Sequence, residues 1–140
     1  MGIKVTDYVA GNEGFEQFPY RCTGNKLSIG HGFNIEDCGI PLKVSRYWLE
    51  HLILEASDDL VGIFGDCSEW GENRFNALVD MRYQMGRRGF RGFKKMIEAV
   101  RRGDWEAAAN ECMDSEYGRG KTRNRAKRNA DMLRRGDGRE

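Results

Sequence analysis

The amino-terminal part of the chain contains the sequence EGFEQFPYRCTGNKLSIGHGFN over residues 13–34. The pattern predicts a short helix just before this stretch, over residues 5–12. Within the stretch it predicts two short strands, over residues 20–22 and 27–29, which are joined through Gly24-Asn25. A small β-hairpin is therefore expected to follow directly after a helix.

Three polar residues accompany this hairpin: Glu13 after the helix, Cys22 at the end of the first strand and Ser28 in the second. Gly30 and Gly32 come next, and a glycine lets the backbone approach another group closely. An acid, a thiol and a hydroxyl can thus meet in one small cleft. Such a meeting points to a reaction and not merely to a fold.

The rest of the chain is predicted to be helical. A long helix is expected over residues 43–64, where Leu49, Ile53, Ala56 and Leu60 repeat at helical spacing. The apolar stripes are interpreted as core, and Cys112 lies on one of them. The other expected segments are a turn over residues 15–18 that ends at Pro19, an irregular loop over 34–41, and helices over 73–85, 93–102, from the cap Asp104 onward, and 122–135.

These segments predict an α+β class that is mostly helical. We expect one domain over residues 1–140, with a hairpin lobe over 14–42, a connecting helix over 43–64, and a helical lobe from 1–13 and 65–140. A cleft between two such lobes is the natural place for a substrate.

Charge is unevenly distributed along the chain, although the net charge is only +1. Residues 36–74 contain nine acidic and three basic residues, whereas residues 117–140 contain nine basic and three acidic residues. The basic C-terminal stretch suggests an anionic partner, and on charge alone a solvated helix face is the simpler interpretation. No segment resembles a signal peptide or a membrane span, so we expect the protein to be made and held in a cytosol.

The four cysteines, Cys22, Cys38, Cys67 and Cys112, show no CxxC motif and no paired spacing. This makes a zinc site an unfavourable interpretation. In a cytosol they are expected to be mostly free thiols.

Glu13 is the candidate general acid. It follows a helix and is flanked by Phe15, Phe18 and Tyr20, which can partly desolvate it. Desolvation keeps a proton on a carboxyl group near neutral pH. This suits cleavage of a glycosidic bond, because the leaving oxygen needs a proton.

At this point the chain resembles the phage-type lysozymes of glycoside hydrolase family 24. The family motif is a Glu, eight residues, an Asp or Cys, five residues and a small hydroxyl residue, and Glu13, Cys22 and Ser28 fit it without a gap. Residues 80–86 (DMRYQMG), 92–93 (GF), 104–108 (DWEAA) and 124–128 (NRAKR) resemble further family motifs in the same order. The resemblance covers most of the chain and implies a two-lobe lysozyme-like fold with no metal and no organic cofactor.

The resemblance also implies roles for individual residues. Glu13 is the catalytic acid, Cys22 takes a position that is often Asp, and Ser28 holds or helps to activate water. The implied sugar contacts are Asn34 and Tyr83, and Arg125 is implied to pair with Glu13. His31 lies at a variable position of the family motif, and we interpret it as a packing or hydrogen-bonding residue.

Cys22 leaves the mechanism open. It can be a thiolate that stabilises positive charge on the sugar, a neutral donor that positions water, or a covalent nucleophile. It can also be a small buried residue, with Glu13 and Ser28 doing the work. Among these we favour hydrolysis in which Ser28 and Cys22 together hold the water.

The implied function is that of a phage endolysin, which hydrolyses the β-1,4 bond between N-acetylmuramic acid and N-acetylglucosamine in peptidoglycan and lyses the host. We expect a monomer that is made in the host cytoplasm, reaches the wall after membrane permeabilisation and attracts anionic envelope polymers through its basic C-terminal helix. The alternatives are a lytic transglycosylase, which gives 1,6-anhydro products, and a non-catalytic module that binds the cell wall or nucleic acid.

Overall fold

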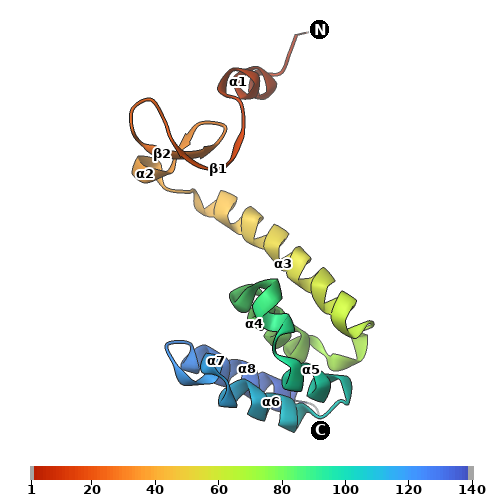
Figure 1. Cartoon of the computed structure of the whole chain (residues 1–140). Coiled ribbons are helices and arrows are strands. Elements are labelled where there is room, and N and C mark those ends of the chain that lie inside the picture. The colour runs from red at the N-terminus through yellow and green to blue at the C-terminus, as the bar shows by residue number, and fades with distance from the viewer. Residues whose placement is uncertain (1, 139–140) are drawn as a thin grey trace. The chain divides into compact units, whose positions relative to one another are not determined.

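The computed structural model describes residues 2–138, which are mostly helical and contain one small antiparallel sheet. The described residues form two compact units, which divide between Trp48 and Leu49 (Figure 1). The predicted α+β class is confirmed, with a sheet near the N-terminus, one long helix and a helical C-terminal part. Among the described residues, no helix has both the length and the apolar character needed to cross a bilayer.

The first unit contains the predicted hairpin, extended to three strands. β2 is the central strand and pairs antiparallel with β1 and β3. Ser28 in β2 therefore faces Tyr20 on one side and Asn34 on the other. The elements are α1 (Val5–Glu13), β1 (Glu16–Arg21), β2 (Leu27–Gly30), β3 (Phe33–Asn34) and α2 (Ile35–Cys38).

Two local predictions in this unit are wrong. Residues 15–18, expected to be a turn, largely belong to β1, and Pro19 lies inside the same strand. A proline is tolerated there because β1 is an edge strand and because its register with β2 is irregular between Glu16 and Tyr20. The expected loop over 34–41 instead contains the end of β3 and the whole of α2.

The helical prediction for the remaining chain is confirmed. α3 (Leu42–Phe64) matches the expected long helix closely, and it is followed by a short 3-10 turn, η1 (Ser68–Trp70). The Asp104 carboxylate accepts a hydrogen bond from the Ala107 amide at 3.0 Å and caps the helix that follows it, as predicted. The other helices are α4 (Glu72–Arg91), α5 (Lys94–Arg101), α6 (Trp105–Asp114), α7 (Glu116–Arg119) and α8 (Arg123–Arg135).

The second unit has an apolar core shared by its helices. Large buried side chains include Leu60 of α3, Phe90 of α4, Met96 of α5 and Leu133 of α8. Cys112 of α6 is fully buried among them, which confirms its assignment to the core. Such a core stabilises the unit mainly by removing apolar surface from water.

Candidate active site

The Glu13 carboxylate lies against the backbone of Gly32. Gly32 has a φ of +76°, and a Cβ atom at this position would lie 2.5 Å from Glu13 Oε2. Only glycine combines this backbone conformation with the absence of a side chain. The prediction that a glycine here permits a close approach is confirmed, and the approaching group is the candidate acid itself.

His31 fastens the same turn to the end of α1. Its Nδ1 atom lies 2.6 Å from the carbonyl oxygen of Gly14, so the ring donates a hydrogen bond to the residue that follows Glu13. The ring also packs near Phe15 and Phe33, with centroid distances of 5.3 and 6.2 Å. The interpretation of His31 as a packing and hydrogen-bonding residue is confirmed.

The expected aromatic wall around Glu13 is not closed within the first unit. Phe15 and Phe18 are 64% and 72% exposed, and Glu13 itself is exposed. Its carboxylate therefore lies against the Gly32 backbone on one side, and the exposure of the residue leaves it open to an incoming group on another.

Cys22 and Ser28 are brought together by the hairpin. Cys22 directly follows β1, and its amide donates a hydrogen bond to the Lys26 carbonyl at 3.0 Å. The Ser28 hydroxyl lies 3.2 Å from the same carbonyl oxygen and is also within hydrogen-bonding reach of the Cys22 thiol. Two members of the motif are thus direct neighbours.

The pKa of the Cys22 thiol is lowered from its ordinary value. Hydrogen bonds from the backbone amides of Lys26 and Gly24 contribute most, burial acts in the opposite direction, and the Ser28 hydroxyl lowers the pKa further. Such donors favour the thiolate because they stabilise its negative charge. The turn therefore makes Cys22 more acidic than an ordinary cysteine.

Ser28 and Cys22 differ in exposure. Ser28 is only 2% exposed, because it belongs to the central strand, whereas Cys22 is partly exposed. Of the two residues, Cys22 has the better access to water. Ser28 lies four residues before Gly32, so the chain between them spans at most about 14 Å.

Asn34 has a structural role in the first unit. Its side-chain oxygen accepts a hydrogen bond from the Asp37 amide and caps α2, and its side-chain nitrogen donates to the Asp37 carboxylate, both at 3.1 Å. Each of these atoms can make one further hydrogen bond. The sugar contact implied for Asn34 stays a prediction.

In the second unit, Arg125 forms a two-pronged ion pair with Asp80. The distances are 2.8 Å from Nε and 2.5 Å from the terminal nitrogen, and Asn129 donates to the same carboxylate at 2.8 Å. Hydrogen bonds from Arg125, opposed by burial and aided by Asn129, hold the pKa of Asp80 below its usual value. Asn129 also contacts the Tyr117 hydroxyl at 2.7 Å, and burial raises the pKa of Tyr117 to about 12.

Asp80 was given no role by the sequence, although it begins the DMRYQMG stretch. One sequence feature points to the partners of Asp80: Arg125 and Asn129 lie four residues apart and therefore share one helix face. This spacing identifies a polar face on the last helix, but it does not identify the residue that binds there, which is Asp80 of α4.

A comparison with models of protein families finds a match over residues 10–131, to the family described as Phage lysozyme. The chain belongs to the phage lysozyme family. A comparison with curated proteins found no match.

As a member of this family the chain is a glycosidase, a muramidase that hydrolyses peptidoglycan and acts as an endolysin. Its substrate is peptidoglycan of the bacterial cell wall. The matched region includes the hairpin with Glu13, Cys22 and Ser28, and also the Asp80–Arg125 ion pair.

Two predicted contacts of residues in the second unit stay predictions, one with the substrate and one with a residue of the first unit. Tyr83 lies on α4 and is 40% exposed, and its expected partner is the glycan. Arg125 is expected to pair with Glu13, and in the second unit its described partner is Asp80.

Proposed function

We propose that this phage lysozyme cleaves the glycan strand with Glu13 as the general acid and with a water molecule held by Cys22. The observation that carries the proposal is the close contact of the Glu13 carboxylate with Gly32. Gly32 lies in the turn that directly follows β2, the strand in which Ser28 lies beside Cys22. An acid and a water-holding group on opposite sides of a glycosidic bond are what hydrolysis requires.

Glu13 would protonate the leaving oxygen of the bond between N-acetylmuramic acid and N-acetylglucosamine. Its carboxylate is exposed on the side away from Gly32, so a substrate oxygen can reach it. The hydrogen bond between His31 and Gly14 limits the movement of the helix end that carries it. A fixed acid loses less entropy in the transition state than a mobile one.

Cys22 would orient the attacking water, and Ser28 would act through Cys22. Ser28 is buried and its hydroxyl is already used by the Lys26 carbonyl and the thiol, whereas Cys22 is partly exposed. Water is therefore better placed to contact the sulfur than the hydroxyl. This modifies the expectation that both residues hold the water together.

The lowered pKa of Cys22 favours its thiolate form, which suits this role. Negative charge at the sulfur would accept a proton from the water and would also stabilise positive charge that develops on the sugar. This gives Cys22 the function that a carboxylate has in family members with Asp at the position. Covalent attack by the thiol is the competing route.

Asn34 and Tyr83 are proposed to bind sugar residues, and Arg125 is proposed to pair with Glu13. For Asn34 the support is the unused hydrogen-bonding capacity of an amide that α2 holds in place. For Tyr83 it is a partly exposed aromatic ring, a group that commonly packs on sugars.

Product analysis tests the chemistry. Purified peptidoglycan is digested, and mass spectrometry of the released muropeptides is expected to show reducing ends. Products with 1,6-anhydro ends would instead identify a lytic transglycosylase. Glu13→Gln is expected to lose activity by at least about 100-fold, whereas the matched control Glu16→Gln, an exposed acid on β1, should remain active.

Delivery of the enzyme to the wall remains a prediction with its own test. We expect a monomer that needs a separate pore to leave the host cytoplasm. Expression with and without a pore-forming protein should give lysis only in its presence. Lysis without that protein would contradict the expectation.

A further inference from the structure

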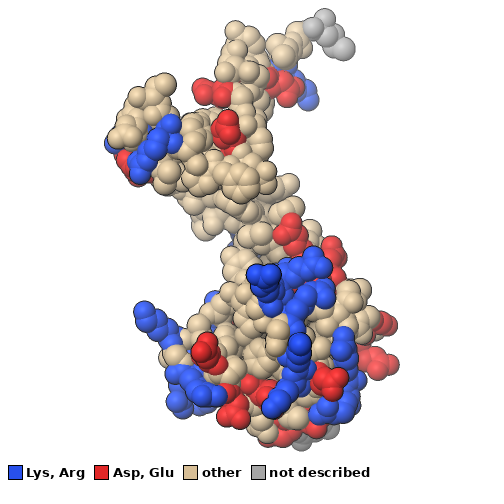
Figure 2. All heavy atoms as spheres, viewed as in Figure 1, with Lys and Arg blue, Asp and Glu red and all other residues tan. Residues whose placement is uncertain are grey.

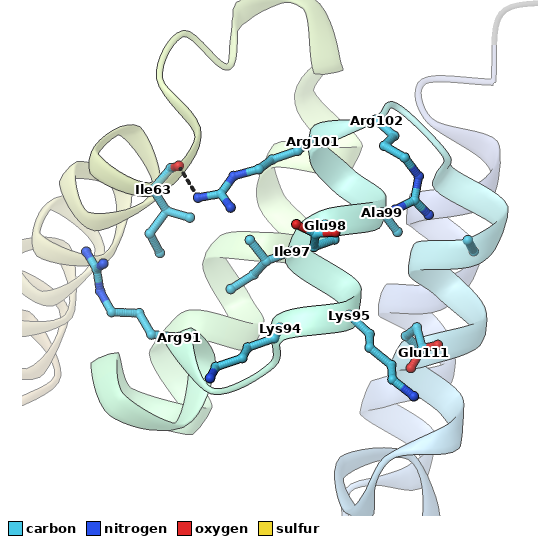
Figure 3. Close-up of a pocket in the computed structure, with 11 residues that line it drawn as sticks. Ile63, Arg91, Lys94, Lys95, Ile97, Glu98, Ala99, Arg101, Arg102 and Glu111 are labelled. Atoms are coloured by element: carbon cyan, nitrogen blue, oxygen red, sulfur yellow. Dashed lines mark hydrogen bonds between the residues drawn. The ribbon is translucent and has the colours of Figure 1, made fainter.

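A pocket of about 730 Å³ lies beside helix α5 in the second unit, and none of the residues assigned to catalysis lines it. Its floor is apolar and includes Ile63, Ile97 and Ala99 (Figure 3). Its rim is basic and consists of Arg91, Lys94, Lys95, Arg101 and Arg102. We call it the α5 pocket.

The segment that forms this rim is strongly basic. Residues 87–102 contain seven Lys or Arg residues and a single acid, Glu98. Figure 2 shows Lys and Arg side chains gathered over the second unit. A concave surface of one charge sign concentrates ligands of the opposite sign.

Some cations of the rim are bound by other residues of the protein, and others have no described partner. Arg101 donates a hydrogen bond to the Ile63 carbonyl at 3.1 Å, and Arg91 binds the Asp59 carboxylate. Lys94 and Lys95 are exposed and have neither a hydrogen bond nor an ion pair among residues 2–138. Figure 3 shows Lys94 on the side of Arg91 and Lys95 on the side of Glu111.

We propose that the α5 pocket binds the phosphate head group of an anionic, hydroxyl-bearing membrane lipid. The lysine amines match a phosphate, and the apolar floor suits the first carbons of an attached acyl chain. The carboxylates of Glu98 and Glu111, which also line the pocket, can accept hydrogen bonds from head-group hydroxyls. Binding would hold the muramidase at a membrane surface beside its wall substrate.

Nucleic acid fits the α5 pocket less well. None of the residues that line it is aromatic, so no platform exists there for stacked bases. The two carboxylates at the pocket also oppose a continuous phosphate backbone. A head group with one phosphate and several hydroxyls avoids both difficulties.

Vesicle binding with charge-reversal variants tests the proposal. The full chain is sedimented with vesicles of phosphatidylcholine, with and without phosphatidylglycerol. The double variant Lys94→Glu/Lys95→Glu is compared with Lys4→Glu/Lys43→Glu, which makes the same charge change at two exposed lysines outside the pocket and outside the basic C-terminal stretch. A Lys94→Gln/Lys95→Gln variant removes the charges without reversing them.

We expect the wild-type chain to bind only vesicles that contain phosphatidylglycerol. Each Lys near an anionic surface strengthens binding about fivefold, so the Gln pair should weaken it by about 25-fold and the pocket reversal by more than that. The control pair should change it by less than about threefold. If both charge-reversal variants lost the same vesicle affinity, binding would depend on net charge alone, and the proposed site would be wrong. An unchanged affinity in the pocket variants would also contradict the proposal.

Soluble ligands separate a lipid from a free phosphate. Short-chain phosphatidylglycerol should bind the wild-type chain more tightly than glycerol phosphate, because only the lipid covers the apolar floor. Equal affinities would overturn the lipid assignment. Tighter binding of a single-stranded oligonucleotide, lost in the Lys94→Glu/Lys95→Glu variant, would also overturn it in favour of nucleic acid.

Discussion

The Nδ1 atom of His31 lies 2.6 Å from the carbonyl oxygen of Gly14 and joins the turn after β2 to the end of α1. Glu13 precedes Gly14, and its carboxylate rests on Gly32 in the same turn. Two contacts between the same short segments therefore hold the proposed acid. His31, which has no proposed chemical role of its own, thus contributes to the geometry of the site.

His31→Ala is expected to lower activity on peptidoglycan about 10- to 100-fold, because a small displacement of a catalytic group is costly. His31→Asn should recover much of the loss, since its amide nitrogen can donate in place of Nδ1. The loss should appear in kcat more than in KM, while thermal unfolding shows a folded protein. Full activity in His31→Ala would show that Gly14 needs no such anchor.

Gly32→Ala is expected to impair both activity and stability. The new Cβ would lie 2.5 Å from Glu13 Oε2, and the φ of +76° is unfavourable for alanine, which costs about 1 kcal/mol. Gly11→Ala is the matched control, because Gly11 lies in α1 with nothing within 4 Å of the added Cβ. The control should keep its activity and gain helix stability, whereas equal activity in both variants would contradict the close seating of Glu13.

The cysteines should react with iodoacetamide in a defined order. Cys22 is expected to react first, because backbone hydrogen bonds lower the pKa of its thiol and the residue is partly exposed. Cys112 should stay unmodified in the folded protein, because burial raises the pKa of its thiol to about 12. Mass spectrometry of peptides after timed labelling measures both rates, and faster labelling of Cys112 would contradict the core assignment.

Ser28→Ala should shift the labelling of Cys22 to higher pH. The Ser28 hydroxyl lowers the pKa of the Cys22 thiol in the folded protein, so its removal should raise that pKa. If Ser28 acts through Cys22, activity should fall together with the thiolate fraction. An activity loss without any shift in the labelling profile would instead indicate that Ser28 contacts the water itself.

Substitutions at Cys22 separate its possible roles. Cys22→Asp should remain active, because a carboxylate can orient water and carry negative charge. Cys22→Ala should lose at least about tenfold. Cys22→Ser is expected to keep partial activity, and full activity in this variant would exclude covalent thiol catalysis. Full activity in Cys22→Ala would leave the chemistry to Glu13 and Ser28.

Asp80→Asn tests the ion pair with Arg125. The folded-state pKa of Asp80 is lowered, so its contribution to stability is present above about pH 4, the value in the unfolded chain, and is lost as the pH falls through the folded-state pKa. The variant should lose about 1 kcal/mol at pH 7, a modest figure because Asp80 is 36% exposed. Its deficit in Tm should shrink below pH 4, whereas Asp58→Asn, an exposed control on α3, should change little at any pH.

Short-range features were the most predictable part of the fold. The Asp104 cap, the long helix α3 and the hairpin turn all depend on residues within a few positions of one another. β3 and α2 were missed because a two-residue strand is defined by its pairing with β2 and has no pattern of its own. Pro19 misled the prediction for a similar reason, since only the place of β1 at the sheet edge makes a proline acceptable.

The candidate site also has features that follow from local sequence and features that depend on distant residues. The neighbourhood of Cys22 and Ser28 follows from a hairpin register that the turn residues largely specify. Arg125 shows the opposite case, because its described partner Asp80 lies 45 residues away on another helix. No local pattern in the chain indicates which carboxylate a distant arginine will bind.

By itself, the sequence determined the residue types, their spacing and hence the family, together with the helices and the hairpin that carry the motif. Only the tertiary structure decided that Glu13 rests on Gly32, that His31 anchors Gly14 and that the backbone of Lys26 and Gly24 lowers the pKa of the Cys22 thiol. The physical reason is the sequence distance over which each effect acts. Helix and turn preferences depend on residues a few positions apart, whereas the pKa and the position of a side chain depend on groups that folding brings together.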